Sequence, residues 1–266
     1  MQIPVRPCRA HAGVYVWRDV NTYLLLITAA LGAGLVNSVA GGGQLLAFPA
    51  MVFAGVPSVM ANASSSVALF PGLLAAALAY RRNFKSLEGI PFKSALAASI
   101  AGGVTGALLL LLTPQSIFDS IIPWLLLFST GVFTFGRAGA RMLGNKMNIN
   151  TTGIIVLQFF FAVYGGYFGG GIGIVMLGVW TLLGHDDIHA LNAYKTLLAG
   201  ALNAAAVILF IAAGKVAWSQ TSIMLLAAVI GGYVGAHTAR RMNPEHVRNV
   251  ISVISVAVTI AFFVRS

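Results

Sequence analysis

The chain has 266 residues, of which 58% are hydrophobic and only 8% are charged. A soluble domain carries roughly 25% charged residues, because water must solvate its whole surface. So few charges cannot cover a water-facing exterior, which excludes an ordinary soluble protein. The composition predicts an all-α protein that crosses the lipid bilayer several times.

The net charge of +10 comes from Lys and Arg clusters between apolar runs. That pattern is typical of cytoplasmic loops rather than of a nucleic-acid-binding surface. The single cysteine, Cys8, excludes an intramolecular disulfide and a cysteine-based metal site. The sequence has no Walker-type phosphate loop, so we expect no ATP-driven pump, no nucleic-acid partner and no cofactor.

Eight apolar segments are each near or above the ~20 residues that a membrane-spanning helix needs. They are 23–53, 59–80, 94–112, 121–136, 152–183, 190–213, 219–238 and 247–264. The first and fifth are too long for one straight crossing, and each contains a glycine triplet. Because glycine permits non-helical backbone, we expect a broken helix or a re-entrant hairpin at each triplet, giving about eight to ten membrane helices.

The two halves of the chain match each other. The triplets align, and each is followed by a polar run, Asn62-Ala63-Ser64-Ser65-Ser66 in the first half and Asn192-Ala193-Tyr194-Lys195-Thr196 in the second. We therefore expect two pseudo-symmetric repeats. The predicted parts are a polar N-terminal segment (1–22), a first transmembrane repeat (23–137), a basic loop (138–151) and a second repeat (152–266).

Three basic clusters bear on the topology. They contain Arg81, Arg82, Lys85 and Lys93; Arg137, Arg141 and Lys146; and Arg240, Arg241 and Arg248. If all three are cytoplasmic, the glycine-broken segments must be hairpins and the repeats are inverted, with both termini outside. This topology, which we favour, places Arg6, Arg9 and Arg18 outside the cell. Eight single crossings would keep those three residues inside but place the Arg240 cluster outside.

The glycine triplets are the first candidate site. Exposed backbone N–H groups and half-helix N-termini near the membrane midplane can bind an anion, although small residues also serve close helix packing. The Asn62 and Asn192 runs follow at the start of later helices. They would either cap those helices or supply neutral donors to a small oxyanion.

Lys195 lies well inside an apolar stretch. A cation at a helix centre costs at least ~2.5–3.5 kcal/mol on insertion scales and is a functional hypothesis by default, the alternative being a side chain that snorkels to the interface. No acidic residue lies deep in any predicted span. This argues against a cation transporter, leaves no carboxylate relay for protons, and makes Lys195 a candidate anion receptor.

Other polar residues are ambiguous. The run His185-Asp186-Asp187-Ile188-His189 has metal-ligand types but lies in a short polar turn, where solvated charges are expected. His237 would be either a proton-linked switch or an interfacial residue. Gln158 and Asn203 would line a cavity or bond across helices. We expect no metal site.

The run Asn37-Ser38-Val39-Ala40-Gly41-Gly42-Gly43-Gln44-Leu45-Leu46-Ala47-Phe48-Pro49 closely resembles the signature of the sulfite exporter TauE/SafE family, also called the toluene-sulfonate uptake permeases. The second-half run is similar to that family's asparagine-alanine-x-lysine-threonine run, and the resemblance covers most of residues 25–264. Two departures are the serine-rich first run, where a Thr-Ser pair is common, and Tyr194, where a small hydroxyl residue is often found.

The resemblance implies a small carrier without ATPase parts, which moves sulfite or organosulfur anions, often outward. We expect a secondary exporter in the bacterial inner membrane, working by alternating access as one half rocks against the other. The alternatives are an anion channel or uniporter, a carrier of another small organic anion, and a membrane enzyme, for which no deep base is present. A coupling proton or ion and the oligomeric state stay open.

The expected substrate site draws on both halves, and no residue is expected to be catalytic. Its members are Gly41, Gly42, Gly43, Gln44, Asn62, Ser64, Ser65, Ser66, Gly169, Gly170, Gly171, Asn192, Tyr194, Lys195 and Thr196.

Overall fold

The computed structural model describes residues 12–39, 42–80, 84, 87, 90–143, 149–183, 187–238 and 244–265. Within them the chain forms ten α-helices and no strand. These are α1 (Ala12–Val39), α2 (Gln44–Phe53), α3 (Ser58–Tyr80), α4 (Phe92–Leu112), α5 (Gln115–Leu143), α6 (Thr151–Tyr167), α7 (Ile172–Leu182), α8 (Ile188–Ala212), α9 (Trp218–Thr238) and α10 (Pro244–Arg265).

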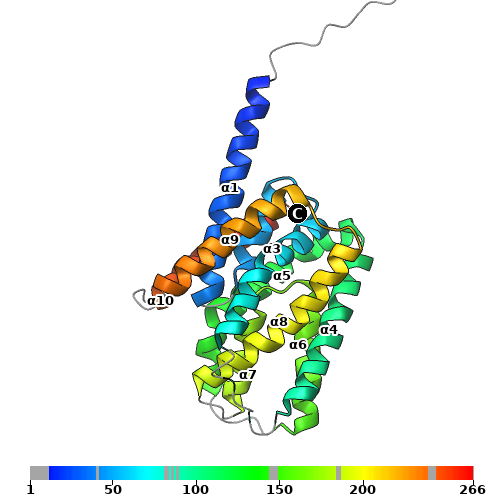
Figure 1. The fold of residues 1–266 in the computed structure, drawn as a ribbon, viewed down its shortest axis with the longest axis vertical. Helices are drawn as coiled ribbons and strands as arrows, with labels where there is room; N and C mark the ends of the chain where they lie inside the picture. Colours follow the sequence, from blue (N-terminus) through cyan, green and yellow to red (C-terminus); the bar gives the residue numbers. More distant parts are fainter. Residues whose placement is uncertain are drawn as a thin grey trace, which may run out of the picture.

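The all-α membrane class is confirmed. Five helices, α1, α3, α4, α5 and α8, contain stretches that are long and apolar enough to cross a bilayer. The first helix begins at Ala12, inside the segment predicted to be a polar arm, and Figure 1 shows it extending beyond the rest of the bundle. Several residues on which the topology prediction depends lie outside the described residues: Arg6, Arg9, Arg81, Arg82, Lys85, Lys146, Arg240 and Arg241.

Both overlong segments are broken at their glycines, as predicted, so eight expected segments become ten helices. Gly42 has φ +115°, and Gly169 and Gly171 have φ +80° and +74°. Residues with a side chain rarely adopt these left-handed conformations. Gly43 has a different constraint, since a Cβ there would lie 2.4 Å from the carbonyl oxygen of Ala33 in α1.

After the first break, α2 packs against α1. Gly43 lies against Ala33, and Leu46, one turn further along α2, lies 3.4 Å from the place that a Cβ on Gly32 would occupy. The start of α2 therefore packs against the last third of α1, on which the first break closes.

The second broken segment returns to the end from which it started. Helices α4 and α6 run in parallel, because Gly102 packs on Ala162 while Gly106, one turn later, packs on Tyr167. The start of α4 therefore marks the end of the bundle where α6 begins. Near the end of α7, Trp180 contacts Tyr194, whose ring also contacts Phe92, the first residue of α4.

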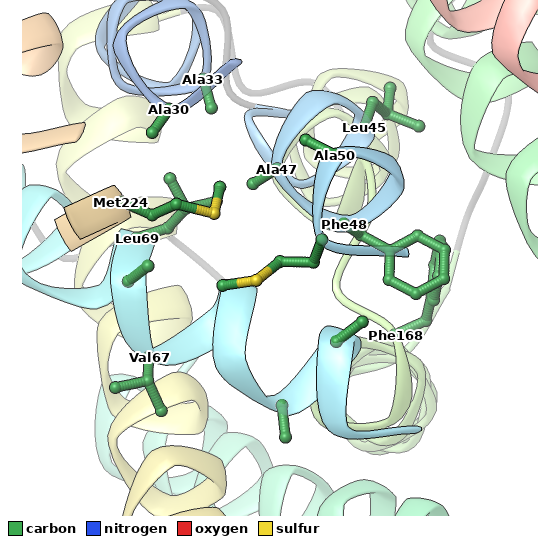
Figure 2. Packing of buried hydrophobic residues seen from close by; sticks show 14 of the residues in the cluster. Ala30, Ala33, Leu45, Ala47, Phe48, Ala50, Val67, Leu69, Phe168 and Met224 are labelled. Carbon is green, nitrogen blue, oxygen red and sulfur yellow. The ribbon is translucent and has the colours of Figure 1, made fainter. Parts of the chain in front are cut away.

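The largest hydrophobic core surrounds α2. Ala47 and Phe48 are fully buried, and the Phe48 ring lies 5.4 Å from that of Phe168 at the second break. Figure 2 shows these residues beside Ala30 of α1 and Met224 of α9. Gly43, Gly170 and Gly171 are likewise buried, as a membrane interior requires of non-helical backbone because it offers no water as a partner.

The helix contacts repeat when α1–α5 are matched in order with α6–α10. Helix α1 packs on α9 as α6 packs on α4, and these are the most extensive contacts in the described part of the chain. In the same way, α3 packs on α9 as α8 packs on α4. The contacts between α3 and α8 and between α5 and α10 join helices that correspond to each other in the two halves. The fourth helix of each sequence half therefore packs against the other half.

Candidate functional site

At the first break, Gln44 begins α2 and is buried. Its Nε2 donates to Oδ1 of Asn62 at 2.9 Å and to Oγ of Ser65 at 2.8 Å. Asn62 in turn donates from Nδ2 to the carbonyl oxygen of Tyr167, the last residue of α6, at 2.8 Å. A neutral hydrogen-bonded network thus joins the first break to α3 and to the edge of the second break.

The three serines after Asn62 have different partners. Ser65 and Ser66 both donate to the Asn62 carbonyl oxygen, at 3.0 and 2.9 Å, as hydroxyls inside helices often do. Ser64 instead accepts a hydrogen bond of 2.9 Å from the backbone N–H of Ala217, just before α9. Of the three, Ser65 is the one that contacts Gln44.

The capping alternative for the two asparagines is wrong. Helix α3 begins at Ser58 and α8 at Ile188, so Asn62 and Asn192 lie in the second turn of their helices. An N-cap residue would precede the first turn. Both asparagines therefore have side chains available for contacts inside the bundle.

At the second break, Lys195 lies over the first turn of α7. Its aliphatic stem crosses Gly173, where a Cβ would lie 3.2 Å from Lys195 Cδ. Its Nζ donates to Oδ1 of Asn192 at 3.0 Å, and Thr196 donates from Oγ1 to the Asn192 carbonyl oxygen at 2.6 Å. The ammonium group is thereby held on α8, and its stem crosses the short helix that follows the glycine triplet.

Tyr194 lies on a different face of α8 from Asn192 and Lys195, because successive helical residues are turned by about 100°. Its hydroxyl donates to the carbonyl oxygen of Ile90 at 2.8 Å. Its buried ring lies among three other aromatic rings, those of Phe84, Phe92 and Trp180.

Two residues at the second break were missed in the sequence. Tyr164 donates to the carbonyl oxygen of Gly170 at 2.8 Å, and its hydroxyl lies 2.6 Å from Oγ of the buried Ser129. A Cβ on Gly170 would lie 2.7 Å from that same Oγ. The tyrosine shortly before the triplet was a readable signal, but nothing in the sequence singles out Ser129 among the polar residues of its helix.

Helix α5 reaches both breaks. Ser129 lies against Gly170, and one turn further along α5 the ring of Phe133 lies 2.8 Å from the place of a Cβ on Gly42. The two glycine breaks, far apart in the sequence, therefore flank one stretch of α5. Of the predicted glycines, Gly41 lies outside the described residues.

The remaining polar candidates have structural roles or fall outside the site. Gln158 donates to Oγ of Ser99 at 2.8 Å, which confirms a bond across helices, whereas Asn203 donates to Ala199 in its own helix. His237 is exposed and stacks on Tyr233. Within the described residues no group of three or more His, Cys, Asp or Glu could hold a metal ion; His185 and Asp186 lie outside them.

Comparison with known proteins gives one consistent result. The sequence model of the family described as "Sulfite exporter TauE/SafE" matches residues 26–262. "Probable membrane transporter protein ORF9" of Sinorhizobium sp is 31% identical over 91% of this chain and 94% of its own length. A "Probable membrane transporter protein" of Haemophilus influenzae is 28% identical over 91% and 95%, and YfcA of Escherichia coli K12 is 28% identical over 87% and 86%.

No solved structure matches the chain. The relatives are bacterial and are named as membrane transporters, which confirms the prediction of a multi-pass membrane transporter rather than an enzyme. With the family match spanning nearly all the described helices, the chain belongs to the sulfite exporter TauE/SafE family.

Proposed function

We propose that this transporter is a secondary carrier of small sulfur-containing anions, such as sulfite or an organosulfonate, and that it exports them by alternating access. The substrate would bind where the two glycine breaks meet α3, α5 and α8. The observation that carries the proposal is the convergence of both breaks on α5, with Asn62 bonded to the end of α6 and Lys195 lying over the start of α7.

The chemistry of these residues suits a small oxyanion. The starts of α2 and α7 follow the breaks, and a helix N-terminus carries a partial positive charge. Lys195 adds a full charge, and charge-assisted hydrogen bonds are about twice as strong as neutral ones. Gln44, Asn62 and Ser65 supply neutral groups that can replace part of the anion's hydration shell.

A carrier fits the surroundings of the breaks better than an open channel does. Gln44, Asn62 and Ser65 are buried and already satisfy one another. An anion could reach them only after the helices around them part, which is a step of a carrier cycle rather than of free diffusion through a pore. An anion channel, or a carrier of another small organic anion, is the alternative that flux data would reveal.

The proposed topology is that of inverted repeats with both termini outside. Two observations support it: the helix contacts repeat when α1–α5 are matched with α6–α10, and the second broken segment returns to the end from which it started. Single cysteines replacing Arg137 and Arg241 in a Cys8→Ser background test it with a membrane-impermeant thiol reagent. The proposal expects both to be labelled from the same side, and labelling from opposite sides would contradict it.

Substrate flux into proteoliposomes tests the function. The panel is sulfite, sulfate, thiosulfate, taurine, sulfoacetate and acetate, and the variants are Lys195→Gln and Lys215→Gln, the latter an exposed lysine before α9 that serves as the matched control. We expect saturable flux of at least one sulfur anion, lowered about tenfold or more by Lys195→Gln, which removes a charged hydrogen bond, and unchanged by Lys215→Gln.

Each failure has its own meaning in this experiment. Wild-type flux of acetate but of no sulfur anion would contradict the substrate class. Flux that rises linearly with concentration and never saturates would favour the channel. Equal flux in the two lysine variants would remove Lys195 from the site.

A further inference from the structure

Eight of the ten described helices pack into two groups that cut across the sequence halves, while α5 and α10 pack on each other and are placed in neither group. The first, called here the α1 group, contains α1, α2, α3 and α9; the second, the α4 group, contains α4, α6, α7 and α8. In the described residues α9 packs extensively on α1 and α3, and α4 on α6 and α8, but neither packs extensively on the other helices of its own half. Figure 1 shows the α4 group together in the lower part of the view.

Helices α4 and α9, which pack on the other half of the chain, contact α6 and α1 backbone to backbone. A Cβ on Gly106 of α4 would lie 2.0 Å from the carbonyl oxygen of Val163 in α6. A Cβ on Gly34 of α1 would likewise lie 2.1 Å from the carbonyl oxygen of Ala228 in α9. Such close glycine-mediated contacts leave no space for a side chain to adjust, so each pair can move only as one piece.

The starts of α9 and α4 are each held by one hydrogen bond from the other half of the chain. Ser64 of α3 accepts from the N–H of Ala217, just before α9, and Tyr194 of α8 donates to the carbonyl oxygen of Ile90, just before α4. Ser64 and Tyr194 occupy the same position of the duplicated run and are both fully buried. The same sequence position thus does the same task in each group.

Contacts between the two groups lie mainly along α3 and α8, which pack on each other as extensively as α3 packs on α9. At the breaks the contacts comprise the hydrogen bond from Asn62 to the Tyr167 carbonyl oxygen and the packing of Phe48 on Phe168. Among the described residues, no glycine of α3 or α8 brings its backbone close to the opposite group, as the glycines of α4 do with α6. This boundary therefore has fewer steric obstacles to sliding, and it passes through the candidate site.

We propose that the α1 group and the α4 group are the rigid bodies that move against each other during transport, with Ser64 and Tyr194 as fasteners inside them. This inference rests on the proposed alternating access, and it replaces the expected rocking of one sequence half against the other. Moving α1–α5 as a unit would have to separate α4 from α6 and α1 from α9, which are the most extensive contacts in the described chain.

Spin-label distances decide between the two sets of moving bodies. Labels at exposed positions of α1, α4 and α6, at Leu24, Leu108 and Phe160, give two informative pairs in a Cys8→Ser background. Leu24 and Leu108 share a sequence half but belong to different groups. Leu108 and Phe160 share a group but belong to different halves. Distances are measured by pulsed EPR in liposomes with and without sulfite.

We expect the Leu24–Leu108 distance to shift with sulfite by more than the width of the Leu108–Phe160 distribution, which should stay fixed. A shift confined to Leu108–Phe160, or no shift in either pair while sulfite is transported, would overturn the proposal. Labels at Ile208 and Leu226, in α8 and α9, repeat the first comparison in the second sequence half, and they too should shift.

Sulfite flux through the same labelled protein separates the two proposals. If flux is absent, the substrate is wrong, and the ligand-free distributions then decide the moving bodies. Two bodies that exchange conformations make the Leu24–Leu108 distribution broader than the Leu108–Phe160 distribution. Equal widths would overturn the inference.

Discussion

The two glycine breaks share a backbone plan but differ in chemistry. At both, the hydroxyl four residues after the asparagine bonds back to the asparagine carbonyl oxygen, Ser66 at 2.9 Å and Thr196 at 2.6 Å. At the first break, Ser65 follows Asn62 by three residues and accepts from Gln44. At the second, Lys195 takes the place of Ser65.

We infer from this difference that the two breaks have separate tasks. The first has neutral groups that are already bonded to one another and to Tyr167, so it holds the bundle together as much as it offers donors. The second brings a charge to the start of α7. If the matched runs are copies, as we propose, the helix break is common to both and the polar side chains around it have diverged.

The largest expected effect comes from breaking the neutral network. Asn62→Ala removes one of the two acceptors of the Gln44 amide, which keeps Ser65, and removes the donor to the Tyr167 carbonyl oxygen. Each unsatisfied buried group costs roughly 1–3 kcal/mol. We expect the temperature of thermal unfolding in detergent to fall by several degrees for Asn62→Ala. It should fall by clearly less for Asn192→Ala, because Asn192 is only partly buried. Equal losses would contradict the division of tasks.

A smaller effect is expected where backbone conformation alone is changed. Gly171→Ala places a side chain at φ +74°, which costs about 1–2 kcal/mol. Gly200→Ala, in the middle of α8 with no atom within 4 Å of its Cβ, is the matched control and should be neutral or stabilising. If Gly171→Ala unfolds at the same temperature as the control, the break does not need its left-handed glycine.

The smallest effect probes the path of the lysine stem. Gly173→Ala would put a methyl group 3.2 Å from Lys195 Cδ, so the flexible side chain must shift by a few tenths of an ångström. We expect KM for the transported anion to rise a few-fold with little change in thermal stability. A KM equal to that of the wild type would show that the stem position over α7 is unimportant.

The sequence predicted the local features of this fold, because they depend on nearby residues. The length of the first and fifth segments and their glycines predicted both breaks. The aligned polar runs predict two repeats, and this stays a prediction that the matching helix contacts support. It did not predict that α4 and α9 would exchange partners, since hydropathy identifies an apolar helix but not the helix against which it packs. For the same reason the sequence did not predict that Ser129 lies beside Tyr164 and Gly170 at the second break.

The prediction for Tyr194 shows a different limit. It was grouped with Asn192 and Lys195 because the three are close in sequence, yet residues three apart share a helix face and residues one or two apart do not. Helical geometry alone would have separated Tyr194 from the other two. The sequence could not supply its partner, the Ile90 carbonyl oxygen, which is 104 residues away along the chain but adjacent in the fold.

The most direct test of the proposed division is the affinity for sulfite of wild type, Lys195→Gln and Ser65→Ala, measured by calorimetry in nanodiscs under anaerobic conditions. Losing the charged hydrogen bond of Lys195 should weaken Kd about 10–100-fold, while losing the neutral hydroxyl of Ser65 should weaken it by about threefold or less. An equal or larger loss for Ser65→Ala would contradict the account, because charge recognition would then not lie at the second break.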